Sequence, residues 1–358
     1  MRLTRLDIAD LRRFERVRLL PGPGVNLILG ANGAGKTSVL EAVHLMAYGR
    51  SFRGRVSDGL VRDGAAAVEV FVEWQEDRGG QRKAGLRHGG QVWEGRLDGS
   101  PVTQLGDLCA ALAVVTFEPG SHALVMGSGE PRRRFVDWGL FHVEPGFLTV
   151  WRRYARALKQ RNALLKARTR DGQLEAWEHE LADAGEPITR SRQRYLEELQ
   201  PRLQQVAAAL APSLGAVQLN YQPGWRRDEM PLTDALLLAR DRDLTTGFTS
   251  VGPHRADWGI DFSAIPGRSA LSRGQGKLTA LSLLLAQAEQ HAATRGEWPV
   301  IALDDLTSEL DCDHQALVLA RLLACGAQVL MTATEAPKLP ALLASATVCH
   351  VEHGVVRP

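Results

Sequence analysis

The stretch Val25-Asn26-Leu27-Ile28-Leu29-Gly30-Ala31-Asn32-Gly33-Ala34-Gly35-Lys36-Thr37 decides the fold class of this 358-residue chain. Its apolar run, Val25 to Leu29, is typical of a buried strand. Residues 30–37 then match the phosphate-loop pattern G-x-x-x-x-G-K-[ST] at every fixed position. From Lys36 to Tyr48 the apolar residues follow helical spacing. Strand, glycine loop and helix in this order predict a nucleotide-binding α/β core.

Each part of this loop has a chemical role. The glycines let backbone N–H groups point at phosphate oxygens, and the helix N-terminus adds partial positive charge. Lys36 is placed to neutralise the β- and γ-phosphates of ATP, and the Thr37 hydroxyl is placed to bind Mg²⁺. The predicted ligands are therefore ATP and Mg²⁺. The residues expected to hold ATP here are Gly30, Ala31, Asn32, Gly33, Ala34, Gly35, Lys36 and Thr37.

A second apolar run, Val300 to Leu303, ends in two carboxylates, Asp304 and Asp305. A buried strand here would bring Asp304 to the phosphate loop as a further Mg²⁺ ligand. Asp305 follows directly and is placed to orient the attacking water as a general base. Lys36 and Asp305 are thus predicted catalytic residues, and Thr37 and Asp304 are the predicted metal ligands.

The segment 271–275, Leu-Ser-Arg-Gly-Gln, resembles the signature of ABC ATPases, usually written LSGGQ. Ser272 is placed to cap the helix that follows. In that superfamily the serine and the helix N-terminus meet the γ-phosphate held by a second subunit. The resemblance thus implies a catalytic role for Ser272 and ATP contacts for Ser272, Gly274 and Gln275. Residues 308–311 resemble the D-loop, and the order of these motifs argues against small GTPases and kinases.

Three positions depart from the ABC pattern. Most ABC ATPases carry glutamate where this chain has Asp305, which is about one methylene shorter and implies slow hydrolysis or a water-mediated contact. The segment 332–334, Thr-Ala-Thr, stands where the switch histidine is expected. Only Glu118 lies near the place of the Q-loop glutamine. The residues that sense the γ-phosphate therefore stay open.

The middle of the chain has a different pattern. Segments 68–74 and 91–97 alternate apolar and polar residues between glycine-rich turns, which predicts an antiparallel β-subdomain. Between about residues 131 and 212, three runs with 3-4 spacing predict helices packed as a short coiled-coil-like arm, with Arg161 in its seam. Pro187 is expected to start the last helix, and Pro201 to kink or split it.

The predicted fold class is an α/β ABC-type P-loop ATPase with an antiparallel β-subdomain and an inserted helical lobe. Residues 1–118 and 292–358 would form the ATP-binding lobe, and residues 119–291 the helical lobe with the arm and the signature. Further strands are expected at 3–8, 17–19, 112–117, 299–303 and 328–332, and a further helix at 313–325.

The composition is that of a globular protein, with 44% hydrophobic and 23% charged residues. No apolar run approaches the roughly 18 residues that span a bilayer, and the N-terminus alternates like a strand instead of a signal peptide. The four cysteines are scattered without a CxxC pair, which argues against a zinc site or a disulfide framework. We therefore expect a cytoplasmic protein without membrane attachment.

Three segments resemble the RecF family of bacterial recombination-mediator ATPases beyond the generic motifs. They are 49–53 (GRSFR), 131–138 (PRRRFVDW) and 251–257 (VGPHRAD, with the GPHR-x-D pattern). The resemblance extends to about Thr334, and the last 20 or so residues carry no motif. It implies an ATP-driven homodimer that binds duplex DNA at gap junctions between single-stranded and double-stranded DNA. It also implies RecR as a partner, a role in loading recombinase in repair, replication restart and SOS induction, and weak, DNA-dependent ATP hydrolysis that causes release.

Clusters of basic residues supply the candidate DNA contacts. Between Arg152 and Arg170 there are eight Lys or Arg and no Asp or Glu, a pattern that suits phosphate contacts without base reading. The alternative is a solvated face balanced by the acids between 171 and 186, and His254-Arg255 is either a structural turn or a phosphate contact. The main candidates are Arg50, Arg53, Arg132, Arg133, Arg152, Arg153, Arg156 and Lys159, followed by Arg12, Arg13, Arg16, Arg18 and Arg134.

Two other functions stay open at this point. The chain could be the nucleotide-binding subunit of a transporter, although the helical arm and the missing switch histidine argue against it. It could also be an SMC-like DNA-bridging protein, whose arm should be far longer. The roughly 80 residues available here would reach only about 60 Å as a helical hairpin.

Overall fold

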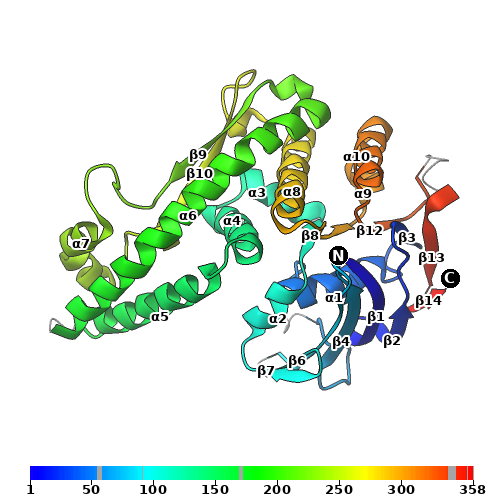
Figure 1. The fold of residues 1–358 in the computed structure, drawn as a ribbon, viewed down its shortest axis with the longest axis horizontal. Coiled ribbons are helices and arrows are strands. Elements are labelled where there is room, and N and C mark those ends of the chain that lie inside the picture. The colour runs from blue at the N-terminus through cyan, green and yellow to red at the C-terminus, as the bar shows by residue number, and fades with distance from the viewer. Residues whose placement is uncertain (55–58, 91, 169–171, 338–343, 353, 358) are drawn as a thin grey trace. The chain divides into compact units, whose positions relative to one another are not determined.

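The computed structural model describes residues 1–54, 59–90, 92–168, 172–337, 344–352 and 354–357. The chain divides into two compact units (Figure 1). Unit 1 comprises Met1–Ser121 with Leu281–Pro358, and unit 2 comprises His122–Ala280. The lobe limits expected from the sequence, at 118 and 292, lie near these unit limits, and the division into lobes stays a prediction.

A mostly parallel six-stranded sheet forms the centre of unit 1, in the order β14-β13-β3-β12-β11-β8. Strands β3, β8, β11 and β12 are buried along their whole length, as expected of parallel strands covered on both faces. The α/β prediction is therefore confirmed. The C-terminal segment, which carries no sequence motif, adds β13 in parallel next to β3. The strands are β3 (Val25–Leu29), β8 (Val114–Phe117), β11 (Val300–Leu303), β12 (Val329–Ala333), β13 (Thr347–Glu352) and β14 (Val355–Arg357).

The second sheet of unit 1 is antiparallel and also has six strands, in the order β2-β1-β4-β5-β6-β7. It confirms the predicted β-subdomain and adds β5, which the sequence pattern did not reveal. Gln91, the first residue of the predicted strand 91–97, lies outside the described residues. The strands are β1 (Arg2–Leu11), β2 (Phe14–Leu19), β4 (Val68–Gln75), β5 (Gln81–His88), β6 (Trp93–Leu97) and β7 (Ser100–Val102).

The helices of unit 1 are α1 (Lys36–Tyr48), α2 (Leu105–Ala111), α9 (Leu306–Glu309) and α10 (Cys312–Cys325). Helix α1 begins at Lys36, as predicted, and ends at Gly49, whose left-handed backbone lets its N–H donate to the Leu45 carbonyl. Asp311 of the predicted D-loop caps α10 by accepting a hydrogen bond from the His314 N–H. The residues of α8 (Arg273–Arg295) begin in unit 2 and end in unit 1.

Unit 2 is mainly helical, as predicted. It contains α3 (Ala123–Met126), α4 (Gly129–Val143), α5 (Phe147–Lys166), α6 (Gly172–Leu210) and α7 (Leu232–Thr246), with a hairpin of β9 (Val217–Gln222) and β10 (Asp257–Phe262). Helix α5 lies alongside the first half of α6 and forms the arm with it (Figure 1). Among the described helices, none has both the length and the apolar character that crossing a membrane requires.

Two expectations for the prolines were wrong, the helix start at Pro187 and the split at Pro201, and a kink at Pro201 stays a prediction. Helix α6 runs without a break through 39 residues, with Pro187 and Pro201 inside it. Each proline removes one helix hydrogen bond and costs about 3 kcal/mol, but α6 buries apolar side chains along its whole length, and this packing outweighs the local preference. The arm is also shorter than expected, because the 20 residues of α5 give it a length of about 30 Å.

Candidate nucleotide-binding site

The phosphate loop lies between β3 and α1 in unit 1. Two glycines are needed there for different reasons. Gly35 has φ of 115°, a backbone conformation that L side chains rarely adopt. A Cβ on Gly30 would lie 2.4 Å from the Val351 carbonyl oxygen of β13, so the C-terminal strand leaves no room for a side chain. These constraints shape a loop whose backbone N–H groups can face an anion.

Lys36 is held over this loop. Its Nζ donates to the carbonyl oxygens of Gly30, at 2.8 Å, and of Ala31, at 3.0 Å. The side chain is almost completely buried and has no carboxylate partner among the described residues. An ammonium group held in this way is available to a phosphate without first breaking an ion pair.

The end of β11 brings Asp304 to the first residues of α1. The Thr37 hydroxyl donates to Asp304 Oδ1 at 2.9 Å, so the two predicted Mg²⁺ ligands are in direct contact. Burial raises the pKa of Asp304, while hydrogen bonds from Thr332 and Thr37 oppose that shift. One hydroxyl and one carboxylate beside a phosphate loop are the protein ligands that Mg²⁺ takes when nucleotide phosphates and water supply the rest. The residues present therefore fit a magnesium ion.

Thr332 of β12 joins the two aspartates. Its hydroxyl donates to Asp304 Oδ1 at 2.7 Å and accepts from the Asp305 N–H at 2.9 Å. Because β11 and β12 are adjacent parallel strands, the hydroxyl can reach both groups at once. The sequence pattern identified Thr332 only as part of the segment that replaces the switch histidine, and did not reveal this role.

Asp305 has a strained backbone and an unsatisfied side-chain oxygen. Its φ of 53° and ψ of 39° lie in the left-handed region, which is uncommon for any residue other than glycine. Its Oδ1 is buried, and no described group forms a hydrogen bond with it. A water molecule placed between this oxygen and a γ-phosphate would satisfy it, which agrees with the predicted role of general base.

These residues share one cavity of about 530 Å³ in unit 1. A larger depression, about 990 Å³, lies over the antiparallel sheet, but its lining contains no phosphate-loop residue and none of the predicted nucleotide or metal contacts. The smaller cavity is therefore the candidate nucleotide site. Its lining includes Asn32, Gly33, Gly35, Lys36, Thr37, Ser38, Asp304, Asp305 and Thr332, together with Arg12, Arg13, Arg53 and Pro119.

A buried glutamate organises the basic side of this cavity. Glu41 of α1 is 0% exposed and accepts two hydrogen bonds from Arg12, at 2.7 and 3.1 Å. Arg53 Nη1 lies 3.7 Å from Glu41, and the Ser51 hydroxyl donates to the same carboxylate. Arg12 and Arg53, which the sequence suggested as DNA contacts, thus lie at the nucleotide cavity. The sequence analysis missed this cluster, although Glu41, a single acid within the apolar pattern of α1, could have indicated it.

Glu118, near the expected Q-loop, closes a turn in this structure. Its backbone N–H donates to the Ser121 hydroxyl at 2.9 Å, and its Oε2 accepts from the Gly120 N–H. It follows β8, and the next residue, Pro119, lines the cavity. The position is thus beside the site, although no glutamine stands there.

The signature serine caps α8 as predicted. Ser272 Oγ accepts from the Gln275 N–H at 3.2 Å, and Gln275 Oε1 accepts from the Ser272 N–H at 2.9 Å, which is a reciprocal capping box. Ser272 and Gly274 are both exposed in unit 2. The arrangement presents this helix start on the surface of its unit.

The arginine-rich segment before the arm is mainly structural. Arg132 is 2% exposed and forms two hydrogen bonds with Asp257, at 2.7 and 2.8 Å. Arg133 donates to the Ala256 carbonyl at 2.8 Å, and Arg134 pairs with Glu130. The 131–138 and 251–257 segments therefore hold each other in unit 2. A buried, ion-paired Arg132 is a poor DNA contact, and we leave it out of the proposed DNA surface.

The basic stretch of the arm divides into paired and exposed residues. Arg161 is 0% exposed and bonds Glu178 and Asp243, at 2.9 and 2.8 Å. Arg153 pairs with Glu180. For Arg153 and Arg161, the positive charge of α5 is thus balanced by acids of α6, which is the alternative that the sequence left open. Arg156 and Lys159 are exposed on α5 and stay predicted DNA contacts, as does the half-buried Arg152.

The other basic candidates lie in unit 1. Arg13 donates to the Gly33 carbonyl at 3.0 Å, and Arg18 pairs with Asp7 at 2.9 Å. Arg50 is half-buried. Burial of His44 lowers the pKa of that histidine to about 3, and the nearby charge of Arg50 contributes to this shift. Arg16 is exposed on β2. A DNA contact by any of them stays a prediction.

Comparison with known proteins gives one consistent result. The family model described as "RecF/RecN/SMC N terminal domain" matches residues 2–357. The chain is 66% identical to the DNA replication and repair protein RecF of Stenotrophomonas maltophilia (strain R551-3), over 99% of both chains. It is 39% identical to the RecF protein of Thioalkalivibrio sulfidiphilus (strain HL-EbGR7), over 100% of this chain and 99% of that protein.

Solved structures agree with these relatives. A structure of "the recombination mediator protein RecF-ATP in RecFOR pathway" superimposes with a TM-score of 0.89 and 25% identity, covering 99% of this chain and 97% of that one. An Smc head bound to the C-terminal winged-helix domain of ScpA superimposes with a TM-score of 0.60 and 17% identity, covering 100% and 96%. The second likeness concerns the fold alone.

Proposed function

The chain belongs to the RecF family, and from this premise we propose that it is an ATP-dependent DNA-binding repair protein. It acts in DNA replication and repair as its relatives do, with ATP as the nucleotide. The finer proposal is a switch in which ATP joins two copies of the chain on duplex DNA at a gap junction. Slow hydrolysis then releases the DNA.

The observation that carries this proposal is the meeting of five residues at one cavity. Lys36 lies over the phosphate loop, Thr37 contacts Asp304, and Thr332 links Asp304 to Asp305. Lys36 binds the β- and γ-phosphates, and the backbone N–H groups of the loop orient them. Asp305 orients the attacking water and accepts its proton. Thr37 and Asp304 would hold Mg²⁺, which when bound neutralises charge on the β- and γ-phosphates.

The exposed signature of a second copy would complete the site. Ser272, Gly274 and Gln275 lie at the start of α8, where N–H groups and the helix dipole favour a negative group. Contact with the γ-phosphate of the partner copy would make ATP part of the dimer interface. Hydrolysis removes that contact, so we propose weak, DNA-dependent ATPase activity whose purpose is release.

RecR and recombinase loading complete the proposal. One solved relative is described as a recombination mediator protein in the RecFOR pathway. We infer that this chain has RecR as a partner. Binding at gap junctions would place the dimer where recombinase must be loaded, in recombinational repair, replication restart and SOS induction. We also propose a cytoplasmic location, where such DNA lies in bacteria.

Sedimentation tests the switch. Wild-type protein with ATP, Mg²⁺ and gapped duplex DNA should sediment as a dimer, and as a monomer without ATP. Lys36→Ala should stay monomeric with ATP, because the phosphates lose their only lysine partner in the loop. Lys83→Ala is the matched control, since it removes an exposed lysine of β5 that is neither a predicted nucleotide contact nor a predicted DNA contact, and it should leave ATP-dependent dimers unchanged.

Two results would refute the proposal. One is a wild-type sedimentation profile that does not change with ATP. The other is ATP-dependent association with no binding to duplex DNA, which would return the transporter subunit to consideration. The SMC-like bridging alternative has weaker support, because the arm is about 30 Å long and too short to reach between distant DNA segments.

A further inference from the structure

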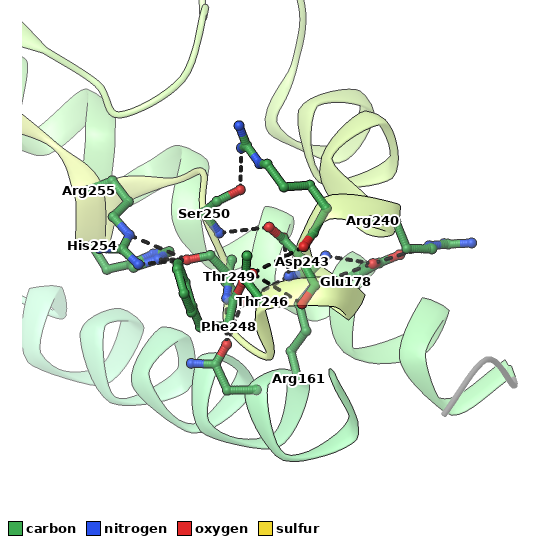
Figure 2. Close-up of polar contacts among 12 residues, drawn as sticks. Arg161, Glu178, Arg240, Asp243, Thr246, Phe248, Thr249, Ser250, His254 and Arg255 are labelled. Carbon is green, nitrogen blue, oxygen red and sulfur yellow. Dashed lines mark hydrogen bonds and ion pairs between the residues drawn. The ribbon is translucent and has the colours of Figure 1, made fainter. Parts of the chain in front are cut away.

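Arg255, in the GPHR-x-D segment, is exposed and yet held in place. Its Nε and Nη2 donate to the Thr249 carbonyl oxygen, at 3.3 and 3.2 Å (Figure 2). Its guanidinium lies over the ring of Phe248, 5.1 Å from the centroid, and that ring is itself 44% exposed. Arginines on protein surfaces usually sample many rotamers. Arg255 is held in one arrangement, because one edge of its guanidinium bonds Thr249 and one face packs on Phe248.

The carbonyl that holds Arg255 is fixed by the core of unit 2. The Thr249 hydroxyl donates to Asn162 Oδ1 at 2.7 Å and accepts from Arg161 Nη1 at 2.9 Å. The Thr249 N–H also donates to Asn162 Oδ1, at 2.8 Å. Arg161 and Asn162 belong to α5, so the loop 248–255 is attached to the arm through Thr249.

The neighbouring histidine is a structural part of the same loop. His254 Nε2 lies 2.9 Å from the Thr249 carbonyl oxygen and must donate to it, and Nδ1 then accepts from the Tyr154 hydroxyl at 2.7 Å. Burial lowers the pKa of His254 to about 4, so the ring is neutral at pH 7. The two hydrogen bonds of His254 therefore make the turn at residues 253–255 rigid, and the positive charge of this turn comes from Arg255.

A second arginine, Arg242 of α7, is held by Ser250, the residue that follows Thr249 in the loop. Its Nη2 donates to the Ser250 hydroxyl, and the Ser250 N–H donates to Asp243 Oδ1 at 3.1 Å. Arg242 is exposed, like Arg255. The two guanidinium groups are thus anchored on consecutive residues, Thr249 and Ser250.

The carboxylates around this loop are already occupied. Glu178 and Asp243 neutralise Arg161, and Glu178 also pairs with Arg240 (Figure 2). Within the described ranges, neither Arg242 nor Arg255 forms an ion pair with a carboxylate. Most exposed arginines of unit 2 that have a fixed geometry, such as Arg153 and Arg194, carry such a partner. Two fixed guanidinium groups without a carboxylate partner, held by consecutive residues of one loop, are each available to an anion.

We propose that Arg255 and Arg242 bind backbone phosphates of DNA. The Nε edge of Arg255 faces Thr249, so the edge formed by Nη1 and Nη2 is left for two parallel hydrogen bonds to one phosphate. Phosphodiesters fit better than carboxylates of a protein partner, because α5 adds further exposed cations, among them Arg156 and Lys159, and has no acidic residue of its own. This inference rests on the proposed function, since it names where that DNA is held.

The salt dependence of DNA binding tests the assignment. For Arg242→Gln with Arg255→Gln, affinity for duplex DNA of any sequence should fall. The slope of log K against log salt concentration should become shallower by about 0.9 for each phosphate that the variant no longer binds, or about 1.8 for both. Arg255→Lys keeps the charge but loses the two-bond edge, so it should reduce affinity and leave the slope close to that of the wild type.

A matched control removes two charges elsewhere in unit 2. Arg194→Gln with Arg226→Gln deletes two exposed arginines that are paired with Glu144 and Glu229, and should leave the slope unchanged. An equal slope in the Arg242/Arg255 double variant and the control overturns the phosphate assignment while the proposed function stands. Loss of partner-protein binding alone, with DNA binding intact, overturns it in favour of an acidic protein surface. Wild-type protein that binds no DNA overturns both.

Discussion

Thr332 shows how one hydroxyl can set the geometry of two acids. It binds the Asp304 carboxylate and the Asp305 backbone at the same time. The first contact orients the predicted Mg²⁺ ligand. The second supports the left-handed backbone that aims the predicted general base, a conformation that costs about 1 kcal/mol or more when nothing holds it. Thr332 is therefore a positioning residue for both carboxylates.

Replacing Thr332 with valine should separate chemistry from nucleotide binding. Thr332→Val keeps the volume of the side chain but leaves the Asp305 N–H without a partner and removes one of the two hydrogen bonds to Asp304 Oδ1. Such losses cost about 1–3 kcal/mol each, so kcat should fall roughly tenfold to a hundredfold. KM for ATP should change little because the phosphate loop is untouched. Steady-state ATPase assays give kcat and KM, and nucleotide-binding titrations against Mg²⁺ should show a higher Mg²⁺ requirement.

Serine is the control at this position. Thr332→Ser retains the hydroxyl and should keep both the wild-type kcat and the wild-type Mg²⁺ requirement. If the valine variant hydrolyses ATP like the wild type and needs no additional Mg²⁺, Thr332 does not position the aspartates.

At the scale of elements, a buried charge network joins the arm to α7. Arg161 of α5 binds Glu178 of α6 and Asp243 of α7, and both Arg161 and Asp243 are 0% exposed. An apolar cluster, Leu165, Leu174 and Leu244, packs the same three helices together. Removing one partner of such a network leaves a buried charge without compensation, which is far more costly than losing a surface pair.

Arg161→Met should therefore destabilise the protein by about 3–5 kcal/mol. Urea unfolding followed by circular dichroism measures the loss, with DNA binding recorded in parallel. Arg153→Met on the same helix is the comparison, since its pair with Glu180 is exposed and should contribute under about 1 kcal/mol. Equal effects of the two substitutions would show that burial of the Arg161 network contributes nothing to stability.

The sequence predicted the elements whose patterns are local and strong. Strand β3, the phosphate loop and α1 follow from residues 25–48 alone, because turn chemistry and periodicity agree there. Strand β5 was missed because only two apolar side chains, Ala84 and Leu86, mark its buried face. Pro187 and Pro201 misled because local propensity opposes the helix while long-range packing maintains it.

The missed parts of the site depend on contacts between distant residues. Thr332 reaches Asp304 only because β12 pairs with β11, and no spacing rule links those positions. The role of β13 beside Gly30 is equally hidden, since the C-terminal segment carries no motif. The division of the arm arginines into paired and exposed residues also requires the packing of α5 on α6.

At the scale of the whole molecule, the proposed dimer would build each ATP site from residues of both copies. The phosphate loop and the aspartates belong to unit 1, and the signature serine belongs to unit 2. Ser272 is exposed, and its capping box fixes the start of α8 at the surface of unit 2. A site shared between copies would explain why ATP could act as part of an interface.

Ser272→Arg should block association without weakening ATP binding. The phosphate loop of the variant is intact, so a fluorescent ATP analogue should bind with wild-type affinity in the monomer. The large cation in place of the serine would fill the space meant for the γ-phosphate of the partner copy. Sedimentation with ATP should therefore show monomers. Loss of ATP affinity in the isolated variant would instead mean that Ser272 serves its own chain.

Mixing two inactive variants gives the sharper test of the shared site. Lys36→Ala has an intact signature but a defective loop, and Ser272→Arg has an intact loop but a defective signature. In a mixed dimer, the loop of the Ser272→Arg copy faces the Ser272 of the Lys36→Ala copy, which restores one of the two composite sites. Equimolar mixing with ATP should then produce dimers that neither variant forms alone, at an affinity below that of the wild type. A site contained within one chain predicts that mixing restores nothing, because each copy would keep its own defect.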